Sequence, residues 1–104
     1  MEKTIQERIT TEVRSADVVM YVKGTPQSPQ CGFSRAVMKI FEDLGVPFKT
    51  IDVLAEPEIR EGIKEFTQWP TIPQIFIKGE FVGGCDIIRD LAQSGELKKM
   101  VKDA

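Results

Sequence analysis

Histidine is absent from this chain of 104 residues. That absence excludes Ser-His-Asp and Cys-His catalysis within the chain, and every metal site that depends on imidazole ligands. The two cysteines, Cys31 and Cys85, are too few for a disulfide framework, and a domain of this length can bury a core without one. Any chemistry must therefore use thiol, carboxylate, amine or backbone groups.

Long apolar runs and an excess of basic residues are lacking as well. No apolar run approaches the ~20 residues that span a bilayer, so we expect no membrane insertion. The net charge is −2, with acids and bases interspersed, which gives no support to nucleic-acid binding. The start lacks the apolar stretch of a signal peptide, and its three glutamates (Glu2, Glu7 and Glu12) do not suit a transit peptide. We predict a cytoplasmic protein, although an organellar chain stripped of its targeting peptide would look the same.

The spacing of apolar residues predicts nine elements along the chain. Helices are expected over residues 2–14, 31–44, 57–66, 86–93 and 96–101. Strands are expected over residues 18–22, 48–53, 74–77 and 80–82. The first two strands, joined through a helix, should be parallel, and the last two should form an antiparallel hairpin. We therefore predict a single α/β domain over 1–104, with a four-stranded mixed sheet and helices on both faces.

Several apolar positions should form the buried faces of these helices. They are Phe33, Ala36, Val37, Ile40, Phe41 and Leu44 in the second helix, Ile59, Ile63 and Phe66 in the third, and Ile87, Ile88 and Leu91 in the fourth. Gly62 lies inside the third helix, where it costs ~1 kcal/mol relative to alanine. Gly83-Gly84 should break the last strand.

Cys31 lies where a loop rich in Gly, Pro and Ser, residues 23–30, gives way to a helix. Free N–H groups and the positive end of the helix dipole favour a thiolate at such a position, and Lys23 would add positive charge. The alternative is a buried structural cysteine, which a polar loop leading into a helix start does not favour. A thiolate is both a nucleophile and a metal ligand, so spacing alone leaves disulfide exchange and iron binding open.

The tetrad Cys31-Gly32-Phe33-Ser34 resembles the CGFS signature of the monothiol glutaredoxins. The similarity extends, in the same order, to residues 23–26, 29–30, 69–74 and 79–86, and so covers nearly the whole chain. It implies a thioredoxin fold of the short, single-domain class.

The resemblance also implies a mechanism, because Ser34 stands where dithiol relatives carry a second, resolving cysteine. Redox activity would then need glutathione to resolve a mixed disulfide. A [2Fe–2S] cluster usually takes four thiolates. One Cys31 from each chain of a homodimer and two glutathione thiolates would complete that set, whereas we do not expect the thiol of Cys85 to be a cluster ligand.

Glutathione carries two carboxylates and an ammonium, so its site needs cations and an anion-binding helix start. Lys23, Arg60 and Lys64 are the candidate cations; Arg60 and Lys64 are four residues apart on one helix face, which could instead be an ordinary solvated face. The family implies a cis peptide bond before Pro73, which would leave the backbone of Ile72 to pair with an extended peptide. The alternative there is an ordinary turn.

The start of the fourth helix is the remaining part of the implied glutathione site. Its free N–H groups would bind the γ-glutamyl carboxylate, with Cys85 contributing through its backbone. Asp86 could accept from the glutathione ammonium, or could only cap the helix.

Three functions follow from the resemblance. The first is an iron–sulfur carrier that passes its cluster to recipient proteins, and the second is a glutathione-dependent thiol–disulfide oxidoreductase that uses Cys31. The third is a regulatory module paired with a BolA-type partner, which could supply the histidine that this chain lacks. Ser34 and the loop at 23–26 favour the first.

Overall fold

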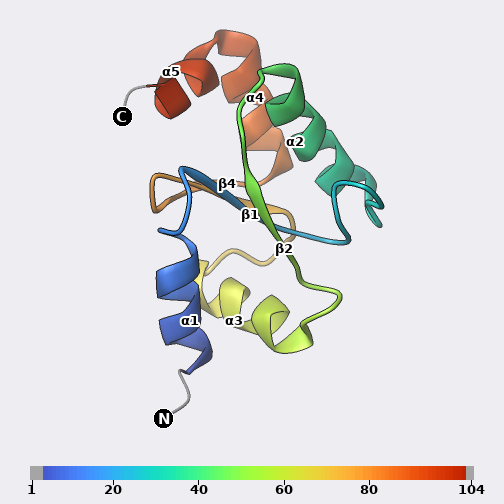
Figure 1. The fold of residues 1–104 in the computed structure, drawn as a ribbon, viewed down its shortest axis with the longest axis vertical. Coiled ribbons are helices and arrows are strands. Elements are labelled where there is room, and N and C mark those ends of the chain that lie inside the picture. Colours follow the sequence, from blue (N-terminus) through green and yellow to red (C-terminus); the bar gives the residue numbers. More distant parts are fainter. Residues whose placement is uncertain (1–3, 103–104) are drawn as a thin grey trace.

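A computed structural model describes residues 4–102 as a sheet between two layers of helices (Figure 1). The strands are β1 (Val18–Val22), β2 (Lys49–Asp52), β3 (Gln74–Ile77) and β4 (Glu80–Gly83). The helices are α1 (Ile5–Glu12), α2 (Gly32–Asp43), α3 (Pro57–Thr67), α4 (Cys85–Ser94) and α5 (Glu96–Lys102). None of these helices is long and apolar enough to cross a membrane.

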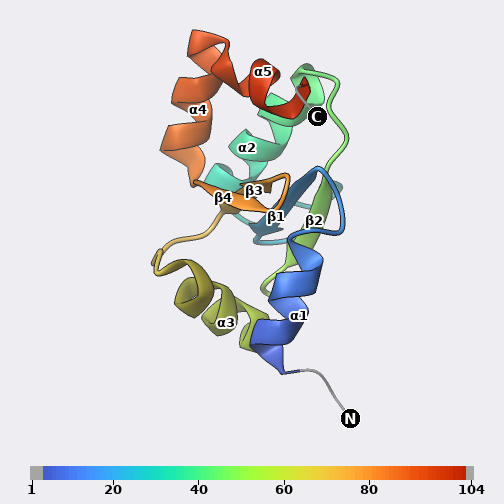
Figure 2. The same ribbon diagram turned by 90° about the vertical axis from the view of Figure 1, so that its left-hand side faces the viewer.

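The sheet has the strand order β2-β1-β3-β4. β1 and β2 are parallel, whereas β3 is antiparallel to both β1 and β4. Figures 1 and 2 show α1 and α3 on one face of the sheet, with α2, α4 and α5 on the other. The predicted α/β class, mixed four-stranded sheet and two helical layers are confirmed.

Two apolar cores explain why β1 is buried along its whole length. Successive side chains of a strand point to opposite faces, so Met20 packs with the α2, α4 and α5 layer while Tyr21 packs with the α1 and α3 layer. The buried strands β1 and β3 lie at the centre of the sheet, and the half-exposed β2 and β4 form its edges. Both faces are therefore covered over the central strands, as the continuous apolar runs predict.

Some predicted boundaries are wrong, and the caps give the reason. The first helix begins at Ile5 because Thr4 and Glu7 form a capping box, and it ends at Glu12 rather than at 14; residues 2 and 3 lie outside the described residues. Cys31 is the N-cap of α2, with φ of −152°, and not its first helical residue. Gly83 belongs to β4, so the strand continues into the glycine pair that was expected to break it.

Three apolar side chains predicted to be buried are exposed instead. Phe33 is 60% exposed, and Phe66 and Ile87 are each 37% exposed. Their neighbours at helical spacing, including Val37, Ile63 and Ile88, are buried as predicted. The helical period is therefore correct, but the apolar stripes of α2, α3 and α4 extend beyond the area that the sheet covers.

Gly62 allows α1 and α3 to approach closely. A Cβ at this position would overlap Ile5 Cγ2 and lie 3.2 Å from Ile9 Cδ1. Gln6 Nε2 also donates to the carbonyl oxygen of Gly62, at 3.1 Å, across the same contact. The glycine lowers helix propensity, but packing between helices requires it here.

Candidate functional site

The loop after β1 returns on itself and places Cys31 beside the end of that strand. The amide of Gln30 donates to the carbonyl of Lys23 at 3.0 Å, and Gly24 pairs with Pro29 in an antiparallel bridge. Gly24 has a φ of +94°, and a Cβ there would lie 2.5 Å from the carbonyl oxygen of Ser28. The loop therefore requires glycine at this turn.

Two side chains hold the end of β1 in place. Ser34 is fully buried and its Oγ accepts from the amide of Lys23 at 3.0 Å. Asp52, at the end of β2, accepts from the amide of Gly24 at 2.9 Å. Ser34 thus fixes the position of Lys23 relative to α2.

Cys31 is partly exposed, and its thiol faces the first turn of α2. Hydrogen bonding from the backbone amide of Ser34 lowers the pKa of this thiol most. Burial opposes this lowering and is the second-largest effect, whereas the amide of Phe33, the hydroxyl of Ser34 and the charge of Lys23 lower the pKa further. The helix start and the neighbouring lysine therefore favour the thiolate, as expected for a reactive cysteine.

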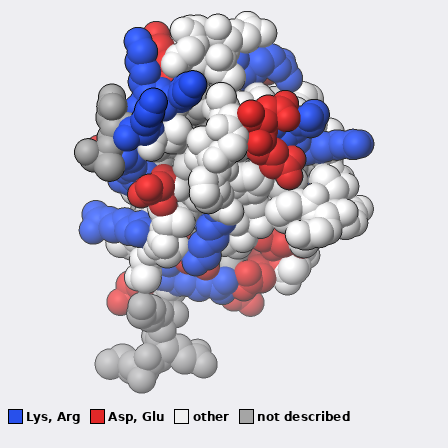
Figure 3. All heavy atoms as spheres, turned by 45° about the horizontal axis from the view of Figure 1, so that its top comes forward, with Lys and Arg blue, Asp and Glu red and all other residues white. Residues whose placement is uncertain are grey.

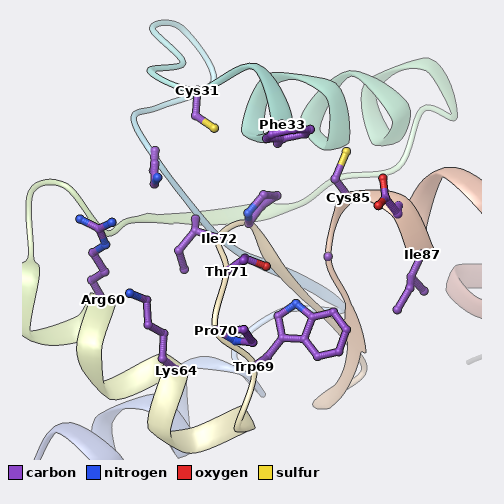
Figure 4. A pocket seen from close by; sticks show the side chains of 14 residues that line it. Cys31, Phe33, Arg60, Lys64, Trp69, Pro70, Thr71, Ile72, Cys85 and Ile87 are labelled. Atoms are coloured by element: carbon purple, nitrogen blue, oxygen red, sulfur yellow. The ribbon is translucent and has the colours of Figure 1, made fainter.

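A cavity of about 790 Å³ opens beside the Cys31 thiol. Figure 4 shows the cysteine at the start of α2, the side chains of α3 across the cavity, and the 69–72 loop and start of α4 along its base and side. The structure brings to this one cavity every residue that the sequence analysis selected, namely Lys23, Cys31, Arg60, Lys64, Ile72, Cys85 and Asp86.

The basic side chains of α3 reach this cavity rather than open solvent. Arg60 and Lys64 extend from neighbouring turns with their nitrogens directed toward it (Figure 4). Lys64 lies 3.6 Å from Glu61 in an ion pair of small worth. The Nε of Arg60 is buried and has no hydrogen-bond partner among residues 4–102. The arrangement provides positive charge on one side of the thiol.

The loop opposite Cys31 contains a cis peptide bond between Ile72 and Pro73. Among the hydrogen bonds of residues 4–102, none involves the amide or carbonyl of Ile72. Trp69 packs edge-on against Phe81, with ring centroids 5.7 Å apart, while also lining the cavity. Ile72, which lines the cavity, therefore has a backbone amide and a carbonyl without partners. An extended peptide could form hydrogen bonds with both groups.

The start of α4 forms the far side of the cavity. Gly84 is the N-cap and supplies no side chain, so the amides of Cys85 and Asp86 have no acceptor within the helix. Asp86 therefore does not cap α4; its exposed carboxylate lies 3.5 Å from Arg89 instead. Burial raises the pKa of the Cys85 thiol, which makes it less reactive than Cys31.

Phe33 and Ile87 are site residues that the sequence analysis assigned to the core. Both line the cavity, and both are exposed there. They give the side near α2 and α4 an apolar surface, whereas the side near α3 is basic. Their helical spacing alone contains no signal for this, because it is shared with the buried residues of the same helices.

Charge and metal-binding groups are sparse elsewhere. Acidic and basic side chains are interspersed on the face in Figure 3, which carries no continuous surface of one sign. Within residues 4–102, no group of three or more Cys, Asp or Glu side chains is arranged to hold a metal ion.

This sheet order, with a cysteine at the start of the helix after β1 and a cis-proline loop facing it, defines a thioredoxin-fold protein. The solution structure of a truncated, monomeric 1-C-Grx1 of Trypanosoma brucei matches with a TM-score of 0.86 and 44% identity, over 98% of this chain and 93% of the other. A buckwheat glutaredoxin–glutathione complex matches with a TM-score of 0.85 and 27% identity, over 95% and 88% of the two chains.

The sequence comparisons give the family. A family model for glutaredoxin matches residues 18–82, and the chain belongs to the glutaredoxin family. A ycf64-like monothiol glutaredoxin of Synechocystis is 51% identical over 104 residues, which are all of this chain and 97% of that protein. The mitochondrial monothiol glutaredoxin-5 of Saccharomyces cerevisiae is 48% identical, over 96% of this chain and 69% of the other. The expected monothiol branch is therefore confirmed.

Proposed function

We propose that this monothiol glutaredoxin binds glutathione in the cavity beside Cys31 and, as a homodimer, carries a [2Fe–2S] cluster to recipient proteins. The observation that supports it most is the combination at one cavity of a partly exposed thiol, three basic side chains and an unpaired backbone edge. A glutaredoxin of similar fold is known as a complex with glutathione.

The glutathione site would use three different groups of the chain. Lys23, Arg60 and Lys64 would pair with one carboxylate, and the backbone of Ile72 would pair with the peptide. The free amides at the start of α4 would bind the second carboxylate, with Asp86 accepting from the ammonium. In this arrangement the glutathione thiol would lie next to the thiol of Cys31.

The thiol ligands of this chain are better suited to a cluster shared by two protomers than to a cluster bound by one chain alone. Cys31 supplies one thiolate, the buried Cys85 has the less acidic thiol, and no group of three or more Cys, Asp or Glu side chains within residues 4–102 could hold a metal ion. One thiolate from each of two protomers and two from glutathione make the four that a [2Fe–2S] cluster takes.

Anaerobic reconstitution with iron, sulfide and glutathione, followed by size-exclusion chromatography with visible absorbance, tests this function. We expect a coloured species at the size of a dimer that is not formed without glutathione. Cys31→Ser should abolish it, whereas the matched variant Cys85→Ser should retain it. A colourless monomer under these conditions would refute cluster binding, and loss of the cluster in Cys85→Ser would refute the ligand assignment.

A second function, glutathione-dependent reduction of glutathionylated proteins, is favoured by the lowered pKa of Cys31. The Cys31 thiolate would attack the glutathione sulfur of the protein mixed disulfide and release the protein thiol. A free glutathione thiolate would then attack that same sulfur, forming oxidised glutathione and returning Cys31. Turnover of a glutathionylated protein in a coupled assay, lost in Cys31→Ser, would establish this function.

A BolA-type protein remains our proposed regulatory partner, since it could supply a histidine ligand that this chain lacks. Mixing the reconstituted protein with a BolA-type protein should change its visible spectrum if a histidine replaces a thiolate.

The compartment also remains a prediction: the composition suits the cytoplasm, and the yeast relative is mitochondrial by name.

A further inference from the structure

Gln74 is a polar residue buried completely at the first position of β3, directly after Pro73. Its side chain does not line the cavity. A buried carboxamide is costly unless its donors and acceptor are paired, so its hydrogen bonds indicate what it does.

These hydrogen bonds go to the segment that forms the base of the cavity and to the last residue of α3. Gln74 Nε2 donates to the carbonyl of Trp69 at 2.8 Å and to the carbonyl of Thr71 at 3.2 Å. Gln74 Oε1 lies 2.8 Å from the hydroxyl of Thr67, whose one proton is shared between this oxygen and the carbonyl of Ile63 at 3.0 Å. The same hydroxyl accepts from the amide of Trp69 at 3.1 Å. The buried carboxamide is thus the centre of a small hydrogen-bond network.

Gln74 forms hydrogen bonds with every second carbonyl of the loop. The carbonyls of Trp69 and Thr71 are directed inward to Gln74, while the intervening and following groups are not. Ile72 comes next and has no hydrogen bond of its own among the described residues. Ile72 lines the cavity and directly follows the carbonyls that Gln74 holds.

Thr67 extends the network to the helix that carries the cations. It is the last residue of α3, whose Arg60 and Lys64 line the same cavity. The Gln74–Thr67 hydrogen bond therefore joins the peptide-pairing loop to that helix.

We infer that Gln74 is a positioning residue for glutathione, because its carboxamide holds the backbone edge of Ile72 in register with the cations of α3. This inference rests on the proposed function. It concerns the recognition of the peptide and not the reactivity of the thiol, since the groups that lower the pKa of Cys31 are Ser34, Phe33 and Lys23.

Gln74→Glu is the sharpest test, because it preserves size and shape. A glutamate has at most one donor hydrogen, even when protonated, so it cannot serve both carbonyls. We expect the dissociation constant for glutathione, measured by titration calorimetry, to rise about tenfold or more. The rate of alkylation of Cys31 by iodoacetamide, followed against pH, should stay that of the wild type. Gln93→Glu makes the same change at an exposed position of α4 and should alter neither value.

Thr67 provides an independent pair of variants if Gln74→Glu fails to fold. Thr67→Val removes the hydroxyl and should weaken glutathione binding about three- to tenfold, whereas Thr67→Ser keeps it and should bind within about twofold of the wild type. Rescue by serine separates positioning from a loss of packing. Wild-type affinity in a folded Gln74→Glu protein, or in Thr67→Val, would overturn the inference alone. A wild-type protein that binds no glutathione would overturn the proposed function and the inference with it.

Discussion

Substitution of Gly62 by alanine tests whether the contact between α1 and α3 is as close as the structure shows. At a solvent-exposed helix position this change stabilises by about 0.8–1 kcal/mol, through helix propensity. Here the added Cβ would overlap Ile5 Cγ2 and crowd Ile9 Cδ1, and overpacking of a core costs about 1–3 kcal/mol. Because the overlap with Ile5 is close, we expect a cost in the upper part of this range, about 2–3 kcal/mol, and after the gain in helix propensity a net loss of about 1–2 kcal/mol. For a domain of this size that loss lowers the melting temperature by roughly 5–10 °C.

The assay follows unfolding by circular dichroism, on heating and in urea. Two further substitutions serve as controls for Gly62→Ala. In Gly32→Ala no atom of the described part of the chain lies within 4 Å of the added Cβ, so the melting temperature should stay unchanged or rise. In a double-mutant cycle, Ile5→Ala removes the overlapping methyl and should recover most of the loss caused by Gly62→Ala. A Gly62→Ala protein at least as stable as the wild type would refute the reasoning, as would additive effects of the two substitutions.

Three further predictions concern the site. Ser34→Ala removes a hydroxyl that lowers the pKa of Cys31, so the thiolate should form at higher pH; the pH profile of iodoacetamide alkylation should shift upward, and an unchanged profile would contradict this. Gly24→Ala forces a side chain into a φ of +94° beside a backbone carbonyl, which should cost about 1–3 kcal/mol in urea unfolding; full stability would contradict the loop geometry. Arg60→Gln and Lys64→Gln should each weaken glutathione binding about two- to fivefold, more at low salt, and calorimetry showing no salt dependence would argue against charge pairing.

The sheet could be predicted from the sequence because its central strands are apolar on both faces. Five consecutive apolar residues in β1 require cover on both sides, and the helices before and after the strand provide it. The crossover between β1 and β2 and the Lys78-Gly79 turn between β3 and β4 then determine which pairs are parallel and which antiparallel. These features follow from neighbouring segments, so the sequence contains them.

Phe33 and Ile87 show where that reasoning ends. Each lies in the first turn of a helix whose later turns pack on the sheet, and the period assigns all of these turns to one apolar face. The first turns of α2 and α4 border the cavity instead, so the same face meets an opening and not the core. The helical period gives the direction in which a side chain points from its own helix axis. Whether that side chain is buried depends on whether another segment of the chain packs against it.

Ser34 and Gln74 show the same limit for polar residues in the core. A hydroxyl or a carboxamide is stable there only when distant backbone groups are directed at it, and in both residues those groups belong to the site: the amide of Lys23 for Ser34, and the carbonyls of the 69–71 segment for Gln74. The serine of the tetrad is therefore more than a missing thiol. Because sulfur is a weaker acceptor than oxygen, a cysteine at this position would hold the end of β1 less firmly. Ser34 is thus also the residue that fixes the position of Lys23, whose charge lowers the pKa of Cys31.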